Sequence, residues 1–159
     1  MIGCTSVVDV LLLPMDKMIH TMDESPSLRI TADLKDLATI RRFVEQASYR
    51  PDANSEVIDD MVIALNEAVT NIIVHGYQNR PGIIEVEVTY DNDSLVVYLR
   101  DEAPPFDPTA ITAPDFPPSL EQPLFGGMGI QMMSKLTTVM TYRTLPKGGN
   151  ELTLIRKGG

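Results

Sequence analysis

Residues 54–76 read NSEVIDDMVIALNEAVTNIIVHG, and this stretch predicts the longest helix of the chain. Its apolar residues recur three and four positions apart, which is the period of one helix face. The apolar face holds Ile58, Val62, Leu65, Val69 and Ile72. Gly76 stands where a helix-terminating glycine belongs, so we expect a helix from about Asn54 to Val74.

The opposite side of this expected helix carries Glu67, Asn71 and His75, each four residues after the last, with Ala64 beside them. One interpretation is a solvated polar face. A partly covered site is the other, because the face is poor in lysine and apolar residues flank it. A carboxylate there can take a proton from a hydroxyl or a water. An amide oxygen one turn away is a ligand that Mg²⁺ accepts.

The rest of the chain predicts one further long helix, several hairpin strands and a third helix near the C-terminus. Asp33 is a candidate N-cap for a helix through about Tyr49. Alternating apolar and polar residues indicate strands. The expected strands cover residues 27–32, 83–90, 95–100, 138–144 and 151–157. This order predicts an α/β two-layer sandwich: a mixed, mostly antiparallel sheet covered on one face by three main helices.

Composition limits the classes of function. The chain has 159 residues, a formal net charge of −9 and one cysteine. A length of this kind suits one domain, which we place at residues 27–159 behind an N-terminal extension, 1–26. The acidity argues against direct binding of nucleic acid or an anionic membrane. A single cysteine excludes a disulfide framework, so we expect a cytoplasmic protein.

Two more segments carry chemical signals. Asp101 ends an apolar strand and precedes residues 104–123, which hold more than half of the chain's twelve prolines and predict a lid-like loop. An aspartate there also suits a turn. The run Gly126-Gly127-Met128-Gly129 opens an expected helix to about Leu136. Such a run is either a flexible hinge or a place where backbone N–H groups receive a phosphate.

Together these segments resemble a known superfamily. Glu67-Ala-Val-Thr-Asn71-Ile-Ile-Val-His75 looks like the N-box of the Bergerat-fold ATPases, which include gyrase-type topoisomerases, heat-shock chaperones and sensor histidine kinases. Asp101 to Asp107 resembles the next box, and Gly127 to Ile130 resembles the phosphate-binding glycine box. The closing segments, Gly127-Met-Gly-Ile-Gln-Met-Met-Ser-Lys-Leu and Gly149-Asn-Glu-Leu-Thr-Leu-Ile, are similar to one branch in particular, the bacterial anti-sigma-factor serine/threonine kinases. The resemblance covers about Leu28 to Lys157.

The resemblance implies a role for each matching residue. Asn71 would ligate Mg²⁺, Glu67 would act as the base on the attacking hydroxyl, and Asp101 would accept a hydrogen bond from the adenine amino group. His75 would lie at the edge of the ATP site. The remaining ATP-binding residues implied are Ala103, Gly126, Gly127, Met128, Gly129 and Ile130. Ala103 departs from the family, which usually has glycine at that position.

The resemblance also implies partners and an activity. We expect ATP and Mg²⁺ as cofactors, and a sigma factor and an anti-sigma-factor antagonist as partners. A homodimer is an open alternative for the oligomeric state. The antagonist would be phosphorylated on serine or threonine. No lysine or arginine occurs from Asp101 to Ser134, which leaves Lys135 or Arg80 as nearby cations. An alternative is therefore a nucleotide-gated binding module without turnover. A catalytic fragment of a histidine kinase is disfavoured, because no dimerisation helix with an acceptor histidine precedes the domain.

Overall fold

The structure is a computed structural model, and it describes residues 24–110 and 127–158. Its five strands are β1 (Ser27–Thr31), β2 (Ile83–Asp91), β3 (Ser94–Asp101), β4 (Val139–Thr144) and β5 (Asn150–Arg156). Its α-helices are α3 (Leu37–Ser48), α4 (Ser55–Asn71) and α5 (Gly127–Leu136). Three short turns of helix are η1 (Leu34–Asp36), η2 (Ile72–Gly76) and η3 (Pro108–Ala110).

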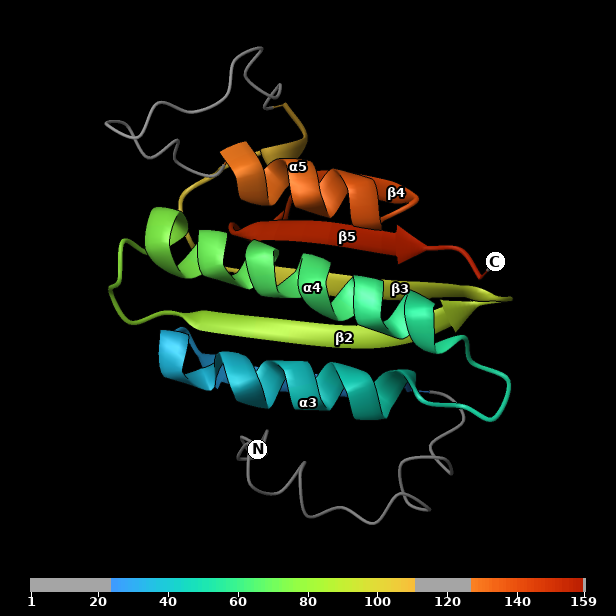
Figure 1. Cartoon of the computed structure of the whole chain (residues 1–159). Coiled ribbons are helices and arrows are strands. Elements are labelled where there is room, and N and C mark those ends of the chain that lie inside the picture. Colours follow the sequence, from blue (N-terminus) through green and yellow to red (C-terminus); the bar gives the residue numbers. More distant parts are fainter. Residues whose placement is uncertain (1–23, 111–126, 159) are drawn as a thin grey trace.

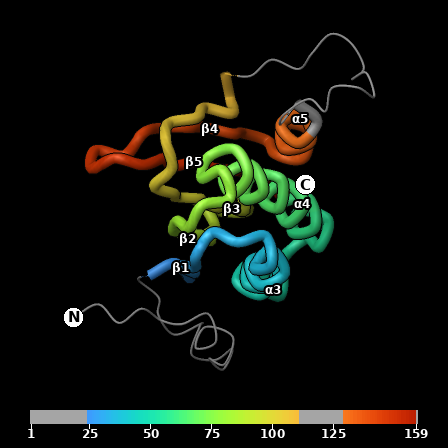
Figure 2. Tube along the Cα trace, turned by 90° about the vertical axis from the view of Figure 1, so that its left-hand side faces the viewer, coloured from blue at the N-terminus to red at the C-terminus, as the bar shows by residue number. Residues whose placement is uncertain are grey.

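The five strands form one sheet in the order β1-β2-β3-β5-β4, and each pairing is antiparallel. Helices α3, α4 and α5 lie side by side on one face of this sheet, with α4 in the middle (Figures 1 and 2). The predicted two-layer sandwich is therefore confirmed. Because β5 lies between β3 and the edge strand β4, the end of β3 meets the start of β5, and Asp101 lies opposite Asn150.

The core lies between the sheet and the helices, as the residue periods predict. In β2, Ile84, Val86 and Val88 are buried, and Glu85 and Glu87 alternate with them on the other face. Small residues let α5 approach α4, where Ala64 and Ala68 are buried beside the predicted polar face. The side of α4 that carries Glu67 and Asn71 is thus partly covered, and a fully solvated face is wrong.

The open face of the sheet carries a row of alternating charges. Strand register places Arg29, Glu85, Arg100, Glu151 and Arg143 in line across all five strands. The Arg100 guanidinium donates to Glu85 at 2.9 Å, to Glu87 at 2.7 Å and to Glu151 at 2.7 Å. Arg143 donates to Glu151 at 2.7 Å. The row thus ties together the ends of β3 and β5 next to Asp101 and Asn150.

The start of the first helix differs from the prediction. Asp33 caps the 3₁₀ turn η1, since its Oδ1 accepts from the Lys35 N–H at 3.0 Å, and the α-helix begins only at Leu37. A 3₁₀ turn advances each residue by more than an α-helix does. Leu34, in this turn, is 45% exposed.

The second helix and the loop after β3 also differ in detail. The α-helical part of residues 54–74 ends at Asn71, and a π-helical turn, η2, follows and is closed by the Tyr77 N–H bonding the Ile72 carbonyl. Pro108–Ala110 form a 3₁₀ turn within the expected irregular loop. Most of the extension 1–26 and of the expected lid lies outside the described residues. In the described ranges, no helix has the length and apolarity to cross a membrane.

Candidate functional site

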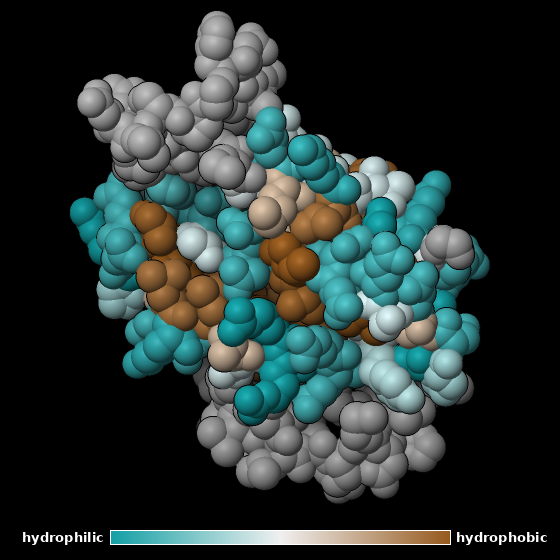
Figure 3. All heavy atoms as spheres, in the orientation of Figure 1, coloured by the Kyte–Doolittle hydropathy of each residue, from teal (hydrophilic) through white to brown (hydrophobic). Residues whose placement is uncertain are grey.

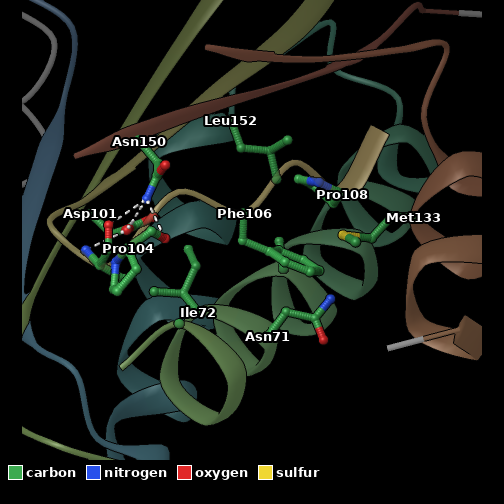
Figure 4. Close-up of a pocket in the computed structure, with 12 residues that line it drawn as sticks. Asn71, Ile72, Asp101, Pro104, Phe106, Pro108, Met133, Asn150 and Leu152 are labelled. Atoms are coloured by element: carbon green, nitrogen blue, oxygen red, sulfur yellow. Dashed lines mark hydrogen bonds between the residues drawn. The ribbon is translucent and has the colours of Figure 1, made fainter. Parts of the chain in front are cut away.

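A pocket lies where the second half of α4, the end of β3, the start of β5 and the loop after β3 meet (Figure 4). It is lined mainly by apolar side chains, with three polar ones. The lining residues are Ala68, Asn71, Ile72, Gly76, Asp101, Ala103, Pro104, Phe106, Pro108, Met133, Asn150 and Leu152. An apolar pocket with a few convergent polar groups is the usual form of a small-molecule site. Three of the predicted residues, Asn71, Asp101 and Ala103, line the same pocket.

Glu67 lies against the first turn of α5. A Cβ added at Gly129 would lie 2.7 Å from the Glu67 Oε2 and 3.6 Å from its Cδ. Only glycine leaves this space free, so the half-buried carboxylate of Glu67 and the backbone of α5 are in close contact. The first N–H groups of a helix have no partner within that helix, and its N-terminal end carries a partial positive charge. The Glu67 carboxylate and the N-terminal turn of α5 are therefore close together.

Asn71 stands one turn after Glu67, and its side chain points toward the pocket (Figure 4). Its Nδ2 is buried and has no hydrogen-bond partner among the described residues. An unpaired buried amide costs free energy, and a bound ligand can remove that cost. The amide of Asn71 is thus available for a ligand.

Asp101 is buried at the end of β3, with 7% of its surface exposed. Its Oδ1 accepts two hydrogen bonds, from the Ala103 N–H at 2.9 Å and from Asn150 Nδ2 at 2.8 Å. Burial raises the pKa of the Asp101 carboxyl, and the donors on Asn150 and Ala103 oppose this rise. No described residue donates to Oδ2, which leaves one carboxylate oxygen as an acceptor for a ligand.

Ala103 fits where a glycine was expected. The described residues with positive φ do not include Ala103, so its turn has no need of glycine. Its methyl lies against Gly76, because a Cβ added at Gly76 would come within 3.0 Å of the Ala103 Cβ. Gly76 in η2, which has no side chain, leaves room for the Ala103 methyl.

Tyr77 holds the loop after β3 against the sheet. Its hydroxyl donates to the Ile83 carbonyl at 2.6 Å and accepts from the Glu102 N–H at 2.7 Å. The ring lies over Gly82, where an added Cβ would come within 2.2 Å of it. The loop that carries Ala103 is therefore fixed at its start by a residue of the segment that follows η2.

The other predicted site residues lie in different places. His75 is half-buried in η2 and does not line the pocket. Ile130 is 5% exposed and belongs to the hydrophobic core, so a side-chain role in binding ATP is not supported. Gly127 and Met128 begin α5, and Gly126 lies outside the described residues.

Sequence reasoning missed two residues of the pocket that carry clear signals. Asn150 is 5% exposed and hydrogen-bonded to Asp101, and Phe106 projects into the pocket from the loop (Figure 4). Asn150 directly follows the glycine pair of the last hairpin turn. A buried polar residue after such a turn is a recognisable signal, but its partner depends on which strand lies beside it.

Comparison with known proteins agrees with this geometry. A family model described as the histidine kinase-like ATPase domain matches residues 30–156, which include all the described pocket residues. A crystal structure of the RsbU and RsbW domains of a Mycobacterium tuberculosis protein has a similar fold, with a TM-score of 0.54 and 22% identity. The similarity covers 84% of this chain and 32% of that one, and it concerns the fold alone.

Two curated relatives indicate the branch of this ATPase family to which the chain belongs. An anti-sigma F factor of Thermoanaerobacter sp. (strain X514) is 32% identical over 117 residues, covering 73% of this chain and 79% of that protein. An anti-sigma F factor of Clostridium acetobutylicum is 30% identical over 81 residues, covering 51% of this chain and 57% of that protein. The chain belongs to the anti-sigma-factor branch of the histidine kinase-like ATPase family.

Proposed function

We propose that this chain is an anti-sigma regulatory factor that binds ATP with Mg²⁺ and phosphorylates a serine or threonine of an antagonist protein. When it is free, it sequesters a sigma factor. Residues 27–159 form the ATP-binding domain of this proposal. The similarity to curated anti-sigma F factors supports the regulatory part. The pocket geometry supports the kinase part.

One observation carries the kinase proposal. The Glu67 carboxylate lies against the first turn of α5, and Asn71, one turn later on α4, lines the pocket that Asp101 closes. In this arrangement Asp101 Oδ2 accepts from the adenine amino group and the first turn of α5 receives phosphate. Glu67 then lies at the phosphate end of the nucleotide, where a base is needed.

The side chain of Asn71 fits a magnesium ligand. Mg²⁺ binds proteins through one or two oxygen ligands, together with substrate phosphates and waters. Asn71 lines the pocket and offers such an oxygen, while its Nδ2, which is buried without a partner among the described residues, is left to donate to an oxygen of the ligand. When bound, the ion neutralises charge on the phosphates during transfer.

Glu67 supplies the proton chemistry. Its carboxylate takes the proton of the acceptor hydroxyl while the hydroxyl oxygen forms a bond to the γ-phosphorus. The bond between that phosphorus and the β–γ bridging oxygen breaks and leaves ADP. The N–H groups of the first turn of α5 lie beside the carboxylate and stabilise the charge that develops on the transferred group.

Two variants test this assignment. Glu67→Gln keeps the side-chain shape and should bind ATP–Mg²⁺ nearly normally, yet lose transfer by roughly 10²–10⁴-fold, as expected when a general base is removed. Asn71→Ala should lose Mg²⁺-dependent binding together with transfer. Binding is measured by calorimetry, with Asp101→Asn as the variant that loses nucleotide. Transfer is measured by mass spectrometry of the antagonist. If wild type and Glu67→Gln are equally inactive on every acceptor while both bind nucleotide, the kinase assignment is wrong.

A nucleotide-gated binding module is the second candidate, and one observation favours it. No lysine or arginine is among the described residues that line the pocket. Lys135 lies in the last turn of α5, about 9 Å along the helix from Gly129 at 1.5 Å per residue. Phosphoryl transfer usually relies on cations. The module binds ADP or ATP and exchanges partners without turnover.

The surface supports binding of protein partners. Large apolar side chains are exposed on the helix-covered face, among them Ile63 on α4 and Met132 on α5, at 45% and 41%. Figure 3 shows that apolar residues gather over these helices within a polar surround. Apolar patches of this kind often mark protein interfaces. The net charge of −9 repels the phosphates of nucleic acid. We therefore propose a cytoplasmic protein that binds protein partners and makes no direct contact with nucleic acid.

A further inference from the structure

Asn150 connects the adenine side of the pocket to the edge of the sheet. Its Nδ2 donates to Asp101 Oδ1 at 2.8 Å and to the Ala103 carbonyl at 2.9 Å, as Figure 4 shows. Its Oδ1 accepts from the hydroxyl of Tyr142, a half-buried residue of β4. The amide is 5% exposed and uses both its N–H groups and its oxygen. No donor of Asn150 is left over for a ligand.

These partners allow only one orientation of the amide. A carboxylate and a carbonyl are acceptors, so the nitrogen of Asn150 must face Asp101 and Ala103. A flipped amide would place its oxygen against two other oxygens. The Tyr142 hydroxyl must then donate to Oδ1, and the hydrogen bonds run in one direction from Tyr142 through Asn150 to Asp101.

The backbone also brings the start of β5 close to Asp101, and with it this relay, the chain of hydrogen bonds from Tyr142 through Asn150 to Asp101. Gly149 has a φ of +93°, and a Cβ added there would lie 2.3 Å from the Asp101 carbonyl oxygen. Glycine at that position lets the start of β5 approach the end of β3 closely. The relay is therefore held by the hairpin turn as well as by the side chains.

We propose that Asn150, oriented by Tyr142, is a positioning residue that keeps Asp101 as a hydrogen-bond acceptor and so selects 6-aminopurine over 6-oxopurine nucleotides. This inference rests on the proposed nucleotide site. The Asn150 donor and the Ala103 N–H both occupy Oδ1, and Oδ2 then faces the ligand as an acceptor. An adenine 6-amino group donates to that oxygen. The 6-oxo group of hypoxanthine has no hydrogen to donate and meets it oxygen to oxygen.

The hydrogen bond from Asn150 also affects the pKa of Asp101. Burial raises the pKa of Asp101, and the donor on Asn150 lowers it. Without that donor the carboxyl is protonated at higher pH, and a protonated carboxyl donates to a 6-oxo group. Loss of Asn150 should therefore weaken adenine binding, favour hypoxanthine binding and move the acid loss of adenine affinity to higher pH.

The test uses calorimetry of the full chain with ADP–Mg²⁺ and inosine diphosphate–Mg²⁺ across a range of pH. We expect Asn150→Leu, which has a similar volume and no donor, to reduce the ratio of ADP to inosine diphosphate affinity by at least about tenfold, equal to 1.4 kcal/mol. Its ADP binding should also fail at higher pH than in the wild type. Tyr142→Phe should change the ratio in the same direction by about threefold, since only the orienting donor is lost. Tyr98→Phe, on the open face of the sheet, is the matched control and should change neither quantity.

The outcomes separate this inference from the proposed function. If the wild type binds neither nucleotide, the proposed function and this inference both fail. If the wild type binds ADP and Asn150→Leu weakens both nucleotides equally with an unchanged pH profile, Asn150 is only structural and the inference is overturned while the nucleotide site stands. If circular dichroism shows that Asn150→Leu is unfolded, Tyr142→Phe decides, and an unchanged affinity ratio overturns the inference.

Discussion

Replacing Gly129 by alanine should separate the stability of this protein from its activity. The added methyl would lie 2.7 Å from the Glu67 Oε2, while its other contacts with Glu67, at 3.6 and 3.8 Å, are ordinary. Only the end of one side chain has to move. Alanine is favoured over glycine within a helix by about 1 kcal/mol. Near the first turn of α5 the gain is smaller, so the free energy of unfolding should stay constant or rise by up to about 0.5 kcal/mol.

The same methyl should reduce phosphoryl transfer. To restore an ordinary contact distance, the carboxylate oxygen of Glu67 must move by roughly 0.5–1 Å. A displacement of about 1 Å in a catalytic group can reduce the rate by about 10²-fold. We therefore expect a loss of roughly 10- to 10²-fold in transfer, which corresponds to about 1.4–2.7 kcal/mol in the activation free energy.

Three measurements on one variant test this reasoning. Denaturant unfolding gives stability, calorimetry gives affinity for ADP–Mg²⁺, and phosphorylation of the antagonist gives transfer. Ser134→Ala is the matched control, because Ser134 is an exposed residue of the same helix and its replacement also raises helix propensity. The control should keep full transfer. If Gly129→Ala transfers phosphate as fast as Ser134→Ala, the proposed contact between Glu67 and α5 does not matter for catalysis.

Three further variants probe the frame around the site. Gly149→Ala should lower the free energy of unfolding by more than about 2 kcal/mol and weaken ADP binding, since it combines a positive φ with a clash against the Asp101 backbone. Glu151→Gln should cost roughly 1–3 kcal/mol at neutral pH, because it removes charge-assisted hydrogen bonds from two arginines. Tyr77→Phe should cost about 1 kcal/mol and weaken nucleotide binding, since the loop after β3 loses its anchor.

The Glu151 variant also predicts a pH dependence. Burial opposes ionisation of Glu151, but hydrogen bonds from Arg143 and Arg100 outweigh it and lower the pKa of the carboxyl below its ordinary 4.5. The stabilisation is therefore complete above that ordinary value and is lost as the pH falls through the lower value in the folded protein. As the pH falls below 4.5, the wild type should lose more stability than Glu151→Gln. Parallel curves of unfolding free energy against pH would contradict this assignment.

Controls are available for the other two variants. Gly148 also has a positive φ, of 92°, but an added Cβ would meet no atom within 4 Å. Gly148→Ala should therefore show only the cost of backbone strain, about 1 kcal/mol, and a loss equal to that of Gly149→Ala would refute the clash. For Tyr77, thermal unfolding and calorimetry give both readouts. Unchanged values in Tyr77→Phe would show that the hydroxyl does not hold the loop.

Local sequence patterns were enough to predict most of the fold. The spacing of Val62, Leu65 and Val69 marks a buried helix face, and the alternation from Ile84 to Val88 marks a half-buried strand. These periods follow from the geometry of each element alone. The same geometry places Glu67 and Asn71 on one side of α4. A resemblance to known motifs then indicated Asp101 and the glycine run as parts of the same site.

A local sequence pattern cannot predict which strands and helices pack beside one another. Strand β3 pairs with β5 instead of β4, and this order alone puts Asn150 beside Asp101. Ile130 follows the glycine run in sequence, yet its helix phase turns it into the core and away from the pocket. The sequence by itself determined which residues share an element and a face, because these depend on residues a few positions apart. Only the tertiary structure decided which faces meet, because that depends on the packing of segments far apart in the chain.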